Sequence, residues 1–256
     1  MTQGEQDEFI VGIHAVQAAL RQDPSHLDGI WIDAQREDAR MAALIGAARA
    51  AKVKIHRAPK SRLDEWAGEL RHQGVVARLR AVTVAGEAAL MPWVEAQTQP
   101  LLLVLDGVQD PHNLGACLRS ADAAGVHAVI VPRDAAAPVN ATVRRVACGA
   151  AESVKIFQVT NLARCLDQLR AAGIWLVGAA ADAPQPLYQL DLRGPLGLVL
   201  GGEEKGLRRL TRERCDFLAH LPMAGRVESL NVSVAAGVFL FEAVRQRRIA
   251  PVGARQ

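Results

Sequence analysis

The chain has 256 residues, 50% of them hydrophobic, so it can bury a substantial core and is not a mainly disordered chain. Aromatic residues make up only 4%, which argues against recognition of a partner by a broad aromatic stacking surface. The net charge of +3 neither requires nor excludes a polyanionic partner. The length fits one large domain or two modest ones.

The cysteines and the N-terminus indicate a reduced, cytoplasmic protein. Cys117, Cys148, Cys165 and Cys215 form no C-x-x-C pair and no cluster with zinc spacing, so we expect no metal and interpret the thiols as small buried hydrophobic residues. Residues 1–8 are polar and acidic, unlike a signal peptide. The longest apolar stretch, 232–241, is about half the length needed to span a bilayer, so we expect no membrane contact.

Residues 1–84 are predicted to form a small α/β domain. Short apolar or alternating runs predict strands, and Ala-rich or capped stretches predict helices. Ser61 is placed to cap the helix that follows it, with Glu65 near the first turn. The predicted strands are 9–13, 29–33, 53–56 and 74–79, and the predicted helices end near Leu20 or span 37–51 and 62–71.

Residues 85–98 are interpreted as a linker, because Gly86, Pro92 and the polar residues 97–99 interrupt any long periodic pattern. We expect one short helical turn around Trp93.

Residues 99–256 are predicted to form an α/β domain with a parallel sheet. Continuous apolar runs are typical of strands that are buried on both faces, and here they alternate with helical stretches. Ligands of such sheets bind outside the carboxyl ends of the strands, so the loops that follow the runs are candidate sites. The strands are predicted at 101–105, 128–131, 174–177 and 196–200, and the helices at 113–124, 141–149, 161–172 and 231–248.

The loop after the first run contains Asn113 and Arg119. Asn113 is a good helix N-cap, and Arg119 lies six residues further along, off the same helical face. Both side chains could reach a ligand at the helix start. The alternative is that Asn113 only caps the helix and Arg119 is a solvated helix residue.

The loop after the run 196–200 contains Gly201, Glu203 and Gly206. Leu207 and Arg208 stand where a phosphate-binding loop needs Lys and Ser or Thr, so that motif is excluded. The loop carries two carboxylates, Glu203 and Glu204, which favour a cationic or neutral ligand over a pyrophosphate. The alternative is a plain strand-to-helix turn. A basic cluster follows, which is either a solvated helix face or a phosphate-binding surface: Lys205, Arg208, Arg209, Arg212 and Arg214.

The loop before the last helix contains Pro222, Gly225, Ser229 and Asn231. Ser229 and Asn231 are both good N-caps. One cap would suffice, so two of them suggest that one has another partner. The alternative is a capping box.

Taken in order, these loops resemble the three motifs of the SpoU (TrmH) family of RNA ribose 2′-O-methyltransferases. The first motif is Asn113-x-Gly115-x-x-x-Arg119, the second is Gly201-x-Glu203-x-x-Gly206-Leu207, and the third is Pro222-Met223 followed by Ser229-Leu-Asn-Val-Ser233. The resemblance covers residues 99–250. Residues 1–84 are similar to the family's substrate-binding domain, which resembles ribosomal protein L30e.

The resemblance implies a SPOUT-type catalytic domain with a deep trefoil knot and a homodimer that completes the site. It implies S-adenosylmethionine as cofactor, with main-chain or apolar contacts from Gly201, Leu221 and Leu230. It assigns catalysis to Arg119. Because a guanidinium is a reluctant base, we expect Arg119 to fix a phosphate and stabilise developing charge. Asn113, Glu203, Ser229 and Asn231 are expected to hold Arg119, the ribose or the loops in register.

Within the family, the resemblance is to enzymes that methylate a guanosine ribose in the peptidyl-transferase region of 23S rRNA. Residues 12–17, 72–77, 208–213 and 241–247 carry it. The second motif departs from the family at Glu204, where Gly is common, and a Glu there is strained if the backbone needs positive φ. Open alternatives are a methyltransferase for tRNA or another rRNA site and a catalytically silent RNA-binding relative. A nucleotide-dependent oxidoreductase lacks its fingerprint.

Overall fold

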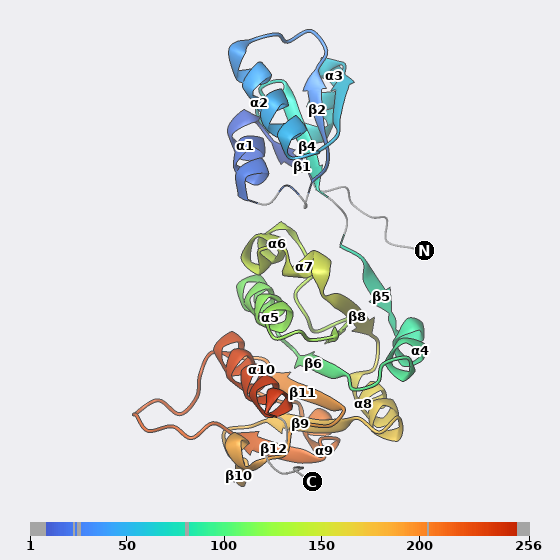
Figure 1. The fold of residues 1–256 in the computed structure, drawn as a ribbon, viewed down its shortest axis with the longest axis vertical. Helices are drawn as coiled ribbons and strands as arrows, with labels where there is room; N and C mark the ends of the chain where they lie inside the picture. Colours follow the sequence, from blue (N-terminus) through green and yellow to red (C-terminus); the bar gives the residue numbers. More distant parts are fainter. Residues whose placement is uncertain (1–8, 23, 25–26, 80–81, 204, 250–256) are drawn as a thin grey trace, which may run out of the picture. The chain divides into compact units, whose positions relative to one another are not determined.

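The computed structural model describes residues 9–22, 24, 27–79, 82–203 and 205–249. These residues belong to two compact units, Met1–Val82 and Thr83–Gln256, and each unit has its own sheet and core (Figure 1). Glu204 lies outside the described residues.

Unit 1 is a mixed four-stranded sheet with helices on both faces. The strand order is β1-β4-β2-β3, with β2 and β3 parallel and the other pairs antiparallel. Helices α1 and α2 bury the larger core against one face, and α3 packs on the other face. The elements are β1 (Phe9–Val11), α1 (Ile13–Gln22), β2 (Leu27–Asp33), α2 (Ala39–Ala50), β3 (Ile55–Ala58), α3 (Lys60–Ala67) and β4 (Val75–Leu79).

The predicted cap at Ser61 is wrong. Helix α3 begins at Lys60, two residues before the predicted start at residue 62, and Pro59 occupies the N-cap position without a side-chain hydrogen bond. Pro59 is extended, with φ −66° and ψ 150°, and the helical conformation begins directly after it, so Ser61 falls inside the first turn. The helix also ends at Ala67, before the predicted boundary, where Gly68 adopts a φ of +56°.

Unit 2 contains, among its described residues, eight strands that are all parallel, in the order β10-β12-β9-β11-β6-β7-β8-β5. The predicted parallel sheet is therefore confirmed. The strands are β5 (Val84–Gly86), β6 (Leu101–Asp106), β7 (Ala128–Pro132), β8 (Lys155–Val159), β9 (Trp175–Ala179), β10 (Gln185–Pro186), β11 (Leu196–Gly201) and β12 (Phe217–His220). The trefoil knot stays a prediction of the resemblance.

Helices cover both faces of this sheet (Figure 1). One face carries α5 (Pro111–Ala123), α6 (Ala141–Ala147), α7 (Ala150–Ser153) and α10 (Val232–Arg248), and the other carries α4 (Leu90–Glu95), α8 (Leu162–Ala171) and α9 (Arg209–Glu213). Two 3₁₀ turns, Glu87–Ala89 and Leu187–Gln189, complete the unit. Strand β6 is buried along its whole length, as its continuous apolar run predicts.

The segment interpreted as a linker is folded into unit 2. Strand β5 pairs with β8, and Leu90 and Val94 of α4 are buried in the main core. The Trp93 ring lies 5.4 Å from the ring of Phe157. Leu90 and Val94 are four residues apart, so they share one helical face, and a six-residue helix is too short to show a clear periodic pattern.

Four strands were not predicted: β5, β8, β10 and β12. All four are short, and each begins with an exposed residue, so none of them shows a continuous apolar run. Helix α5 begins at Pro111 with Asp110 as N-cap, so the predicted cap at Asn113 is wrong and Asn113 lies within the first turn. The predicted cap at Asn231 is correct, because its side chain accepts a hydrogen bond from the Ser233 N–H.

None of the described helices combines the length and the apolar character that crossing a membrane requires.

Candidate functional site

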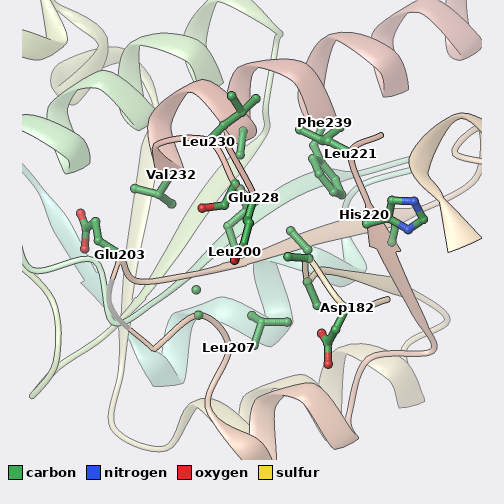
Figure 2. Close-up of a pocket in the computed structure, with 18 of the residues that line it drawn as sticks. Asp182, Leu200, Glu203, Leu207, His220, Leu221, Glu228, Leu230, Val232 and Phe239 are labelled. Carbon is green, nitrogen blue, oxygen red and sulfur yellow. The ribbon is translucent and has the colours of Figure 1, made fainter. Parts of the chain in front are cut away.

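A cavity of about 360 Å³ opens at the carboxyl ends of β9, β11 and β12, which are neighbours in the sheet (Figure 2). Three loops and the first turns of α10 line it. The lining residues are Ala179, Ala180, Ala181, Asp182, Leu200, Gly201, Gly202, Glu203, Lys205, Gly206, Leu207, Arg212, Ala219, His220, Leu221, Met223, Glu228, Ser229, Leu230, Val232, Ala235 and Phe239. Parallel strands bring these loops together because all their carboxyl ends lie at one edge.

The cavity combines an apolar interior with carboxylates at its wall. Figure 2 shows Leu207, Leu221, Leu230 and other apolar side chains around the space. The carboxylates belong to Asp182, Glu203 and Glu228, and Arg212 donates a hydrogen bond of 2.8 Å to Asp182. That hydrogen bond holds the pKa of the Asp182 carboxyl below its ordinary value. Such a cavity suits a ligand with a flat apolar ring and a positive charge.

The loop after β11 folds back on itself so tightly that Gly201 has no room for a side chain. A Cβ atom there would lie 1.9 Å from the carbonyl carbon of Gly206. Gly202 and Gly206 form an antiparallel bridge, and Gly206 has a φ of +59°. The glycines of the second motif are thus required by the turn itself.

Asp106, at the end of β6, holds the loop after β11 in place through hydrogen bonds with Arg208. Its side chain is fully buried and accepts hydrogen bonds from the backbone N–H and the Nε of Arg208, at 3.0 and 2.5 Å. Sequence reasoning missed Asp106. The sequence did contain a signal, a carboxylate directly after an apolar run. A buried charge needs a dedicated partner, so such a carboxylate predicts a specific cationic or N–H contact.

A hydrogen-bond chain connects the three motif loops. Asn113 Nδ2 donates to Glu203 Oε1 at 2.5 Å, and Asn231 Nδ2 donates to Asn113 Oδ1 at 3.0 Å. Asn231 Oδ1 in turn accepts from the N–H and the hydroxyl of Ser233, at 2.9 and 2.7 Å. Asn231 therefore caps α10 and binds Asn113 at once, and Ser229 lines the cavity instead of capping the helix.

The cavity gathers only part of the predicted site residues. Gly201, Glu203, Leu221, Ser229 and Leu230 line it. Asn113 and Asn231 reach it through Glu203. Arg119 is exposed on α5, outside the lining, and its Nη1 donates to Cys148 Sγ at 3.6 Å.

The described arginines of the basic cluster after β11 form salt bridges with carboxylates of the same protein. The pairs are Arg208 with Asp106, Arg209 with Glu213, Arg212 with Asp182 and Arg214 with Asp167. A surface whose charges are already matched attracts polyanions weakly, so the structure favours the solvated helix face over a phosphate-binding surface.

Among the described residues, no group of three or more His, Cys, Asp or Glu side chains is arranged to hold a metal ion.

Two family models match this chain. The SpoU rRNA Methylase family matches residues 100–241, and the model for RNA 2′-O ribose methyltransferase substrate binding matches residues 9–85. The first match contains the cavity and all three motif loops, and the second covers nearly all of the described part of unit 1.

Similar proteins match over nearly the whole length. The 23S rRNA (guanosine-2′-O-)-methyltransferase RlmB of Pseudomonas aeruginosa is 56% identical over 94% of this chain and 97% of that protein. The protein of that name from Escherichia coli strain K12 is 54% identical over 94% and 99%.

Among solved structures, the SpoU methyltransferase AviRb from Streptomyces viridochromogenes in complex with AdoMet is 27% identical, with a TM-score of 0.66 over 94% of this chain and 90% of that one. An RNA 2′-O ribose methyltransferase is 26% identical, with a TM-score of 0.61 over 93% and 88%. By its sequence and its fold, this chain belongs to the SpoU rRNA methylase family.

Proposed function

We propose that this protein transfers a methyl group from S-adenosylmethionine to the 2′-hydroxyl of a guanosine ribose in 23S rRNA. The observation that carries the proposal is the joining of three distant loops, by Asn113, Glu203 and Asn231, beside one cavity. Relatives that are more than half identical over almost the whole chain bear the name of that activity. We place the reaction in the cytoplasm, where ribosomal RNA is found.

The cavity fits S-adenosylmethionine. Its volume of about 360 Å³ lies within the usual range for small-molecule sites. Leu207, Leu221 and Leu230 offer apolar surfaces for the adenine ring, and the carboxylates of Glu203 and Glu228 match the positive charges of the sulfonium and ammonium groups. The bound cofactor supplies a methyl group whose carbon–sulfur bond breaks, with the electron pair kept by sulfur, as the ribose oxygen bonds to that carbon and loses its proton.

The residues of this chain orient the ribose and stabilise charge. In-line attack demands a fixed geometry more than covalent help. The hydrogen bonds that link Ser233, through Asn231 and Asn113, to Glu203 would hold the loops in that geometry. Arg119 would bind a phosphate beside the reacting hydroxyl and stabilise the negative charge that develops on its oxygen. The guanidinium is not the base, so the proton leaves to another acceptor or to water.

Unit 1 would select the RNA. Residues 9–85 match a substrate-binding model, and the unit has a sheet and core of its own. We keep the predicted assignment of residues 1–84 to RNA binding and of residues 99–256 to catalysis. The short segment between them folds with the catalytic unit.

A homodimer would complete the site. Val234 and Phe241 are about half exposed, and they lie seven residues apart, on one face of α10. Helix α10 packs beside α5, which carries Arg119 (Figure 1). A partner on this face would cover the apolar side chains and bring a second copy close to Arg119. Phe241→Arg should shift the protein toward a monomer in size-exclusion chromatography, whereas Leu210→Arg, at a similarly exposed position on α9, should not.

The reaction itself is tested with purified protein, labelled S-adenosylmethionine and transcripts of 23S rRNA fragments and of tRNA. Label in a 23S fragment, mapped by alkaline-resistant linkages to the 3′ side of a guanosine, is the expected result. Label in tRNA alone would point to the sister activity. Tight cofactor binding without transfer to any RNA, native 23S rRNA included, would identify a silent RNA-binding relative.

A further inference from the structure

Arg119 differs from most of the described arginines of unit 2 in the kind of partner it has. Nine arginines in the described part of that unit bind carboxylates at 2.5 to 2.9 Å: Arg144, Arg164, Arg170, Arg193, Arg208, Arg209, Arg212, Arg214 and Arg245. Arg247 donates to backbone carbonyls instead, and Arg119 donates to the sulfur of Cys148.

Cys148 sits where α6 ends, in a conformation that presents its thiol to α5. Its φ of +50° and ψ of 47° place it in the left-handed region, which non-glycine residues enter rarely. Its Sγ donates to the carbonyl of Arg145 at 3.6 Å and accepts from Arg119 Nη1 at 3.6 Å. The two bonds leave the sulfur fixed between the end of α6 and the arginine.

Cys148 also differs from the other cysteines. Burial raises the pKa values of the Cys117, Cys165 and Cys215 thiols to about 12, whereas Cys148 is exposed. The expectation that all four thiols are buried hydrophobic residues is therefore wrong for Cys148. Packing does not account for a cysteine that is exposed, left-handed and hydrogen-bonded on both sides.

We propose that Cys148 is a positioning residue for the methyl transfer: it holds the Arg119 guanidinium in place through a neutral acceptor, so that the full positive charge stays available to RNA. The inference rests on the proposed role of Arg119. A carboxylate at this position would orient the guanidinium equally well, but it would neutralise the charge and repel a phosphate. A thiol is a weak acceptor that an incoming phosphate or developing alkoxide displaces readily.

Two variants of Cys148 separate the effect of a negative charge at this position from the effect of changing the side chain. Asn and Asp are nearly the same size, and both tolerate the left-handed conformation, so Cys148→Asn and Cys148→Asp differ in charge at one position. We expect Cys148→Asn to keep the single-turnover rate at saturating RNA within about fivefold, because it retains a neutral acceptor. We expect Cys148→Asp to lower that rate by about 10²-fold, as the loss of a positioned charge does.

The same two variants in an Arg119→Ala background show where the added charge acts. With no guanidinium to neutralise, Cys148→Asp should cost no more than Cys148→Asn. A further large loss in that background would mean that the carboxylate repels RNA directly, and this would overturn the proposal. Equal rates for the Asn and Asp variants of the Arg119-containing enzyme would overturn it as well.

Two further measurements separate this proposal from others. Thermal unfolding and calorimetric cofactor binding should be alike for the Asn and Asp variants, since neither variant touches the cavity. If Arg119→Ala keeps full activity, the role proposed for Arg119 fails. A large difference between the Asn and Asp variants with an inactive Arg119→Ala enzyme supports both proposals. A normal Cys148→Asp enzyme with an inactive Arg119→Ala enzyme refutes the role of Cys148 alone.

Discussion

Asn231 and Asn113 lie 118 residues apart in the sequence, and their side chains share a hydrogen bond of 3.0 Å at the rim of the cavity. Asn113 passes the connection on to Glu203. Asn113, Glu203 and Asn231 each belong to a different motif, so these hydrogen bonds form only when the three motifs are correctly placed. Residues that act as one unit give strongly non-additive effects when they are changed.

Replacement of Glu203 tests this network. Glu203→Gln keeps an oxygen that accepts from Asn113, whereas Glu203→Ala removes it. At saturating S-adenosylmethionine we expect the Gln variant to retain turnover within about threefold and the Ala variant to lose about tenfold, the cost of a hydrogen bond to a charged group. Single-turnover methyl transfer measures both. Equal losses in the two variants would show that the negative charge of Glu203 matters and not its contact with Asn113.

Arg119→Ala should lower the rate of methyl transfer by about 10²- to 10³-fold, as removal of an oxyanion-hole donor does. Cofactor affinity should not change, because Arg119 does not line the cavity. Arg119→Lys should rescue little, since a point charge cannot reproduce the planar fork. Parallel loss of affinity and turnover would instead make Arg119 part of the structure of the pocket.

Gly201→Ala should weaken S-adenosylmethionine binding severely in calorimetry. The added Cβ would collide with the backbone of Gly206 and Leu207, at 1.9 to 2.2 Å, so the loop that forms one wall of the cavity must move. Gly194→Ala is the matched control, since a Cβ there meets nothing within 4 Å. The prediction is wrong if the two variants bind the cofactor equally well.

The thiols should react unequally. Cys117 and Cys165 are buried and Cys215 is partly buried, and burial raises the pKa values of all three thiols to about 12, so almost no thiolate forms at pH 8. In the native protein we expect a chromogenic disulfide reagent to modify one thiol per chain, and all four after denaturation. The native reaction should vanish in Cys148→Ser. Fast reaction of two or more thiols would mean that unit 2 opens readily.

The boundary between the units can be tested by truncation. A fragment that starts at residue 83 keeps β5 and α4, whereas one that starts at residue 99 loses buried Leu90 and Val94 and uncovers the edge of β8. We expect the shorter fragment to be less stable by at least about 3 kcal/mol, since loss of one large buried side chain costs about 2 to 5 kcal/mol. Urea unfolding measures the difference. Equal stability would mean that residues 83–98 act as a linker.

The sequence alone determined the parallel sheet and the three loops that matter. The sheet follows from a local pattern, since runs such as 101–105 are apolar throughout because the strand is covered on both faces. The first two motifs come after such runs, whereas the third follows the short strand β12 and was found by its resemblance to the family. The shortest strands of unit 2 escaped prediction. Strands β10 and β12 have too few residues for a period to show, and pairing with neighbouring strands stabilises them. The short helical turn around Trp93 was predicted, but its burial in the core was not.

The tertiary structure decided what the motif residues do. Asn113 is a cap by its residue type, yet Asp110 takes that position because Pro111 begins the helix, and Asn113 is left free to bind Glu203. The partner of Arg119 is likewise beyond local reasoning, since Cys148 lies 29 residues away and reaches the arginine only by a left-handed turn. Local sequence sets propensity, but contacts between distant residues depend on how the sheet orders its strands.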